Sequence, residues 1–68
     1  MTQFNAVMIA EGVEEATQKE QLEAWAYLIK TGLCWNLQGW FGRQAYSLIQ
    51  AGAISNTGEI NKELYESL

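Results

Sequence analysis

The sequence predicts a mainly α-helical fold, a small bundle of three to four helices. Two stretches repeat apolar residues at helical spacing, a capping signal precedes the first of them, and a glycine follows each one. The chain has 68 residues, which is enough for one domain. We therefore expect a single helical domain over residues 1–68.

The first predicted helix covers residues 3–11, where a strand is the open alternative. Phe4, Val7 and Met8 fit one helical face at spacing i, i+3, i+4. Ile9 falls on the opposite side, so the face is not clean. We favour a short helix, followed by a loop over residues 12–16.

The second predicted helix has the clearest start in the chain. Thr17 is followed three residues later by Glu20, which is the pattern of a capping box. Lys30 then suits the helix dipole in the last turn, and Gly32 provides a left-handed stop. One apolar stripe faces the core and consists of Leu22, Trp25, Ala26 and Ile29.

The third predicted helix runs over residues 36–51 and stops at Gly52. Leu48 lies at the centre of its stripe, so we expect it in the core. Gly39 and Gly42 fall inside this helix, where a glycine costs roughly 1 kcal/mol relative to alanine. Close approach of another backbone would justify them, and a ligand laid against the helix is the alternative. The stripe consists of Leu37, Phe41, Ala45, Leu48 and Ile49.

The last residues predict a turn and a short helix. Ile54 and Ile60 can pair in a short β-hairpin near residues 53–60, with Gly58 at positive φ in its turn. Asn61 then caps a helix over residues 62–68 that should bury Leu64, and Leu68 with it.

The chain lacks the residues for the disulfides and metal sites that stabilise many small domains. One cysteine, Cys34, and no histidine exclude an internal disulfide and argue against a structural zinc site. Apolar residues make up 49% of the chain and charged residues 18%, below the usual ~25%. Good packing or self-association must then stabilise the fold, and we expect a homodimer.

The net charge of −4 disfavours nucleic acid as a partner. The four cations are Lys19, Lys30, Arg43 and Lys62, which are spread singly and form no basic patch. The alternative function is a helix-turn-helix DNA-binding regulator, because two helices joined around residues 32–35 and followed by a hairpin could imitate a winged fold.

No membrane partner is expected, because the apolar run at residues 6–10 is far too short to span a bilayer. The start of the chain also lacks a basic segment followed by a long apolar run. These features and the lone cysteine favour the cytoplasm.

No catalytic, cofactor-binding or metal-binding residue can be assigned, so we do not expect an enzyme. There is no histidine for general base catalysis near pH 7. Cys34 lies between Leu33 and Trp35, which favours a packing role over a nucleophilic one. A solvated acidic surface is favoured over a metal or acid–base site for the loose cluster Glu11, Glu14, Glu15, Glu20 and Glu23.

The candidate interaction residues are Trp40, Arg43 and Ser47, at spacing i, i+3, i+7, together with Trp35. Arg43 can stack on Trp40, and tryptophan and arginine are enriched in binding hot spots. Alternatively, Arg43 binds helix-end carbonyls or pairs with a glutamate.

Residues 31–52 combine a Thr-Gly turn, the run Leu-Gln-Gly-Trp-Phe-Gly-Arg and a Leu-Ile helix end before another glycine. This combination resembles a family of short, uncharacterised proteins encoded by tailed bacteriophages. It departs at Trp40, where the family often has a small residue before the aromatic. The resemblance implies a phage or prophage origin, action in the host cytoplasm, and a host or phage protein as a candidate second partner. The family has no assigned activity.

Overall fold

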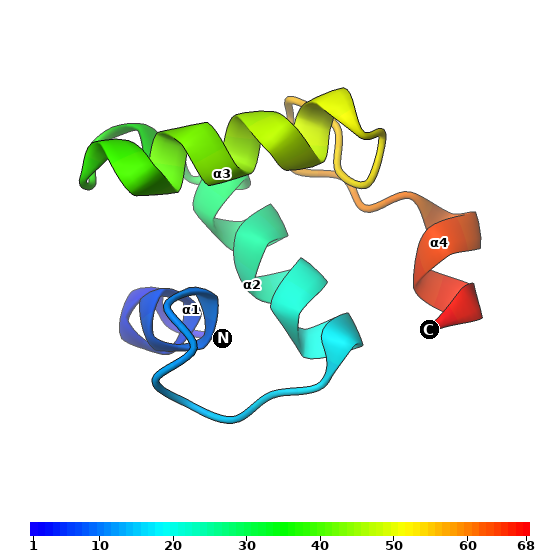
Figure 1. Cartoon of the computed structure of the whole chain (residues 1–68), viewed down its shortest axis with the longest axis horizontal. Coiled ribbons are helices and arrows are strands. Elements are labelled where there is room, and N and C mark those ends of the chain that lie inside the picture. The colour runs from blue at the N-terminus through cyan, green and yellow to red at the C-terminus, as the bar shows by residue number, and fades with distance from the viewer.

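The computed structural model describes residues 1–68 and contains four α-helices, one 3-10 turn and no sheet. In Figure 1, α3 lies across one end of α2, α1 lies beside α2, and α4 stands apart on the other side. The mainly α-helical small bundle predicted from the sequence is confirmed. The elements are α1 (Gln3–Ala10), α2 (Gln18–Lys30), η1 (Leu33–Trp35), α3 (Gly39–Gln50) and α4 (Lys62–Ser67).

The ends of α2 are fixed by local chemistry, as predicted. The Thr17 hydroxyl accepts a hydrogen bond from the Glu20 amide at 3.1 Å, and the Thr17 amide donates to the Glu20 carboxylate at 2.8 Å. Both halves of the capping box are therefore present. Gly32 follows the helix at φ 77°, where a residue with a Cβ would be strained.

Two sides of α2 are buried, whereas the sequence indicated one. The predicted stripe lies in the core, and Ala24 and Leu28 on a second side have no exposed surface. The side chain of Gln21 donates to the Ile9 carbonyl at 2.8 Å and so ties α2 to α1. The helix is thus the central element, with α1 and α3 packed on different sides.

The first segment is a helix, as favoured, but only part of the predicted face packs on the core: Val7 does so, partly buried, whereas Phe4 does not. Phe4 is 71% exposed, and Ala6 and Ile9 are the buried residues. Apolar side chains surround this helix, so their spacing could not select a face. Contact with α2 decides the orientation instead.

The third helix begins at Gly39 rather than near Asn36. The Asn36 amide donates to the Leu33 carbonyl at 2.9 Å and closes the turn of η1, after which Gln38 is extended. Gly39 therefore lies in the first turn, where helix propensity matters less. Gly42 is the glycine inside the helix.

The stripe of α3 packs on the core, but its most deeply buried part is not where we expected it. Phe41 and Ala45 are buried, whereas Leu48 is only half-buried. The end of the helix at Gly52, at φ 78°, is as predicted.

The segment after α3 turns back against α2. Ile54 and Ile60 form a single antiparallel bridge. The predicted hairpin is therefore present only as one pair of bridged residues, without extended strands. Gly58, at φ 88°, lies directly on α2: a Cβ there would stand 2.7 Å from Lys30 Cβ and 2.9 Å from the Ala26 carbonyl oxygen. Glycine allows this close approach, which the sequence did not indicate.

The last helix packs through a side chain that we did not predict. Asn61 caps α4 as expected, accepting from the Leu64 amide at 3.1 Å. Leu64 and Leu68 are 37% and 43% exposed, so the prediction that they are buried is wrong. Tyr65 packs on the core instead, because a helix this short turns only one side towards α2.

Candidate functional site

Three of the predicted interaction residues lie together on the outer side of α3. Trp40 is 42% exposed, and Arg43 and Ser47 are also exposed. Their spacing places them on the side of the helix away from Phe41 and Ala45. In Figure 1, α1, α2 and α4 all lie on one side of α3, and no other helix lies beyond its opposite side.

One edge of the Trp40 ring packs against other aromatic rings, and its other edge is exposed to solvent. Its ring centroid lies 5.8 Å from that of Trp25 and 4.9 Å from that of Phe41, the latter edge to face. Such aromatic pairs contribute about 0.5–1.5 kcal/mol beyond the area that they bury. The ring is thus held in place while it remains available to a partner.

Arg43 does not stack on Trp40, which was one of the two possibilities that the sequence left open. Its Nη1 atom lies 3.1 Å from the position that a Cβ on Gly39 would occupy. The guanidinium therefore folds back over Gly39, one turn earlier in the same helix. The missing side chain of Gly39 leaves room for it, which accounts for that glycine without a bound ligand.

Trp35 is not part of the same cluster. It is 49% exposed, and its ring lies 3.6 Å from the position of a Cβ on Gly42. Gly42 and Trp40 are two positions apart and point to different sides of α3. The close approach expected at Gly42 is therefore made by the Trp35 ring, with the Cys34 carbonyl at 3.9 Å. Trp35 forms the opposite edge of the exposed side.

We call this exposed side the α3 face, with Trp35 at one edge, Trp40 at the other, and Arg43, Tyr46 and Ser47 between them. Tyr46 was not among the predicted interaction residues, and it is 59% exposed. Its position four residues after Gly42 could have indicated it.

A groove of about 320 Å³ lies between α2, α3 and α4, and the sequence did not predict it. We call it the α2–α4 groove. Its lining contains three glutamines and no charged residue. The apolar residues that line it are Leu22, Trp25, Leu48, Ala53, Leu64 and Leu68.

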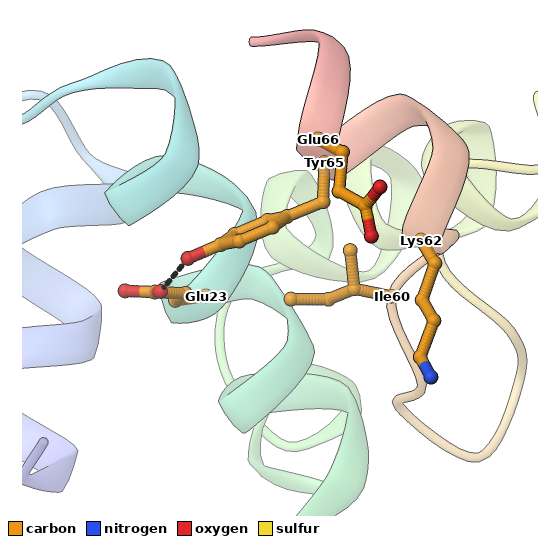
Figure 2. Close-up of a pocket in the computed structure, with 5 residues that line it drawn as sticks. All are labelled: Glu23, Ile60, Lys62, Tyr65 and Glu66. Atoms are coloured by element: carbon orange, nitrogen blue, oxygen red, sulfur yellow. Dashed lines mark hydrogen bonds between the residues drawn. The ribbon is translucent and has the colours of Figure 1, made fainter.

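A second hollow, of about 330 Å³, lies on the other side of α4 (Figure 2). Tyr65 points from α4 towards α2 and donates a hydrogen bond to the Glu23 carboxylate. This hydrogen bond, with burial and the nearby Glu20 charge, raises the pKa of Tyr65. The Lys19 ammonium lies 5.1 Å from the centre of the same ring. These contacts hold α4 against α2.

The charge of the chain is divided between two regions. All eight carboxylates lie within residues 1–23 and 59–68, with Lys19 and Lys62, so these flanks carry a net charge of −6. Residues 24–58 contain Lys30, Arg43 and no carboxylate, a net charge of +2. The α3 face belongs entirely to this middle region. This division of charge can be read from the sequence, but it is not apparent from the net charge of −4 of the whole chain.

The sequence model of a family described as a domain of unknown function, DUF7417, matches residues 2–68. The chain belongs to this family. The expectation of an uncharacterised family is thereby confirmed, and the match covers the ends of the chain as well as the middle. No curated protein and no solved structure matches the chain.

The one cysteine of the chain is free and lies in the core. Cys34 has no exposed surface, and burial raises the pKa of its thiol, which disfavours the nucleophilic thiolate. Nowhere do three or more histidine, cysteine, aspartate or glutamate side chains gather closely enough to hold a metal ion. No helix has the length and apolar character needed to cross a membrane.

Proposed function

We propose that this DUF7417 protein is a small protein-interaction module, without enzymatic activity, that forms a homodimer through its α3 face. One observation carries the proposal. Large aromatic side chains are exposed on the α3 face, and this face lies in the region that contains no carboxylate. Exposed tryptophan and tyrosine beside an arginine are typical of binding hot spots.

The distribution of charge favours a second copy of the chain as the partner. Two molecules of net charge −4 repel each other, and this repulsion is strongest where carboxylates meet. In a two-fold dimer the same surface of both copies is brought together. The α3 face contributes no carboxylate of its own to such pairing, and Glu11 lies only beside its Trp40 edge.

The resemblance to short tailed-phage proteins supports a further part of the proposal. It favours a phage or prophage origin, with the cytoplasm of the host as the place of action. A host or phage protein is then a candidate second partner.

The test is sedimentation equilibrium of the wild type and two variants that each add one negative charge. Ser47→Glu places a carboxylate within the α3 face, while Gln3→Glu places it on an exposed position of α1. We expect the wild type and Gln3→Glu to dimerise, and Ser47→Glu to weaken the dimer by about ten-fold or more. Melting temperature should rise with protein concentration in the first two proteins only.

A wild type that stays monomeric at high micromolar concentration, with a melting temperature independent of concentration, would refute the homodimer. Dimers of equal strength in both variants would place the interface elsewhere. Circular dichroism shows whether each variant keeps the helical fold, so that loss of the dimer is not confused with unfolding.

The alternative, a helix-turn-helix DNA-binding regulator, draws on the arrangement of α2 and α3. The two helices are joined through η1, and the outer side of α3 is free of carboxylates, as a recognition helix requires. Against it, the middle region offers only Lys30 and Arg43 to the phosphate backbone. Retention on heparin resin at low salt would favour this alternative over the dimer module.

A further inference from the structure

We propose that Arg43 of each copy enters a hollow beside Trp40 of the other copy and so sets how the two α3 faces align. The inference rests on the proposed dimer, whose contacts it specifies. Two observations carry it. The hollow has a carboxylate and two aromatic rings in its lining, and the one cation of the α3 face lies at the same end of α3.

The hollow has a volume of about 240 Å³ and lies where the end of α1 meets the start of α3. We call it the Trp40 hollow. A carboxylate beside aromatic rings suits an arginine side chain, because the planar guanidinium can stack on a ring and donate hydrogen bonds to the carboxylate. The lining consists of Glu11, Gln38, Trp40 and Phe41, of which Glu11 alone is charged.

Arg43 is the only charged residue of the α3 face. Its side chain is exposed, and its Nη1 atom lies over Gly39, the first residue of α3. Arg43 follows Trp40 by three residues, which is about 4.5 Å along the helix axis. It does not line the hollow of its own copy. The guanidinium is therefore close to the Trp40 hollow, on the surface that the other copy would contact.

Two-fold symmetry makes the contact reciprocal. In such a dimer, a residue that contacts another residue of the second copy is contacted by the same pair in reverse. Two antiparallel α3 helices related by an axis that passes near residues 41 and 42 place Arg43 of each copy opposite Trp40 of the other. Glu11, the carboxylate beside this edge of the face, then has a cation opposite it.

The contact sets the alignment of the dimer more than its strength. An exposed ion pair contributes little to affinity, because water and dissolved ions screen it. Complementary charges nevertheless select one arrangement over others. Each copy keeps its net charge of −4, so the copies still repel each other overall, and added salt still screens that repulsion.

The test exchanges the two charges and measures the dimer by sedimentation equilibrium. We expect Glu11→Lys and Arg43→Glu each to weaken the dimer by about five-fold or more, because like charges then meet in both hollows. The double variant restores opposite charges and the net charge of −4, so its dimer should be within about two-fold of the wild type. Both side chains are exposed, so the fold should persist.

Two matched controls separate the local contact from the change in net charge. Glu15→Lys changes the net charge as Glu11→Lys does, and Lys62→Glu changes it as Arg43→Glu does. Both control positions are exposed and lie outside the Trp40 hollow. We expect Glu15→Lys to leave the dimer equally strong or stronger, because it lowers the overall repulsion, and Lys62→Glu to weaken it less than Arg43→Glu does.

An equimolar mixture of the Glu11→Lys and Arg43→Glu variants tests whether the contact lies between copies. In their heterodimer opposite charges meet in both hollows, whereas in each homodimer like charges meet. We therefore expect the mixture to associate at least about five-fold more tightly than either variant alone.

A double variant that shows the full sum of the two single losses would overturn the inference. So would a mixture that is no tighter than its components, even if the double variant recovers, because the contact would then lie within one copy. If the wild type dimerises and Ser47→Glu weakens it in either of these cases, the proposed function stands and only the inference fails. A wild type that stays monomeric overturns both.

Discussion

The middle of the chain and its two flanks differ in both packing and charge. Residues 24–58 supply ten of the thirteen buried residues and contain no carboxylate. Residues 1–23 and 59–68 supply three buried residues and all eight carboxylates. The middle therefore forms most of the core and the α3 face, and the flanks form acidic surfaces around it. The comparison shows how so small a chain can keep carboxylates off the residues of one exposed face while the molecule as a whole is acidic.

The largest expected loss of stability is at Gly58, which packs closely against α2 within the middle region. Gly58→Ala adds a Cβ that would stand 2.7 Å from Lys30 Cβ, at a φ of 88°. Backbone strain and overpacking together should lower the free energy of unfolding by about 2–5 kcal/mol. Urea denaturation followed by circular dichroism measures this.

Gly52→Ala is the matched control, because Gly52 has a similar φ of 78° and nothing within 4 Å of an added Cβ. It should cost only the backbone strain, about 1–2 kcal/mol. If both variants lose the same amount of unfolding free energy, the turn at Gly58 is not in tight contact with α2.

The next prediction compares a leucine of the middle with one of the flanks. Leu28 has no exposed surface, so Leu28→Ala should lower the free energy of unfolding by about 2–5 kcal/mol. Leu64 is 37% exposed, and Leu64→Ala should cost less than about 1 kcal/mol. Comparable losses would contradict the conclusion that the core lies mainly in the middle region.

A smaller loss is expected at the start of α2, within the acidic flank. Thr17→Ala removes the hydroxyl that accepts from the Glu20 amide. The cost should be about 1 kcal/mol, which a thermal melt detects. An unchanged stability would show that this capping box does not stabilise the acidic flank.

The smallest effect should be an increase in stability. At Gly42 an added Cβ would be in ordinary contact with the Trp35 ring, at 3.6 Å. Gly42→Ala should raise the free energy of unfolding by up to about 1 kcal/mol, because alanine favours the helix interior. A loss would mean that the Trp35 ring cannot adjust, and that the edge of the α3 face is rigidly packed.

Features set by neighbours in the sequence could be predicted, and those set by distant contacts could not. The capping box at Thr17 and the stop at Gly32 depend on a few adjacent residues, and both are as expected. The orientation of Phe4 and the choice of Tyr65 over Leu64 depend on where α2 lies, which no local pattern encodes.

The candidate site shows the same limit. Helical spacing was enough to place Trp40, Arg43 and Ser47 on one face. The α2–α4 groove is built from three helices and the segment after α3, so it emerges only from the fold. The rotamer of Arg43 depends on the space above Gly39, and periodicity says nothing about it.

The most direct test of the division between a face without carboxylates of its own and acidic surfaces is the effect of salt on self-association. The dimer dissociation constant is measured by sedimentation equilibrium at about 50 mM and about 500 mM sodium chloride, where screening differs strongly. If two acidic molecules meet through the α3 face, salt screens their repulsion, and the dimer should be equally strong or stronger at the higher concentration. A dimer that weakens by ten-fold or more as salt is added would show that opposite charges hold the copies together, and would contradict the account.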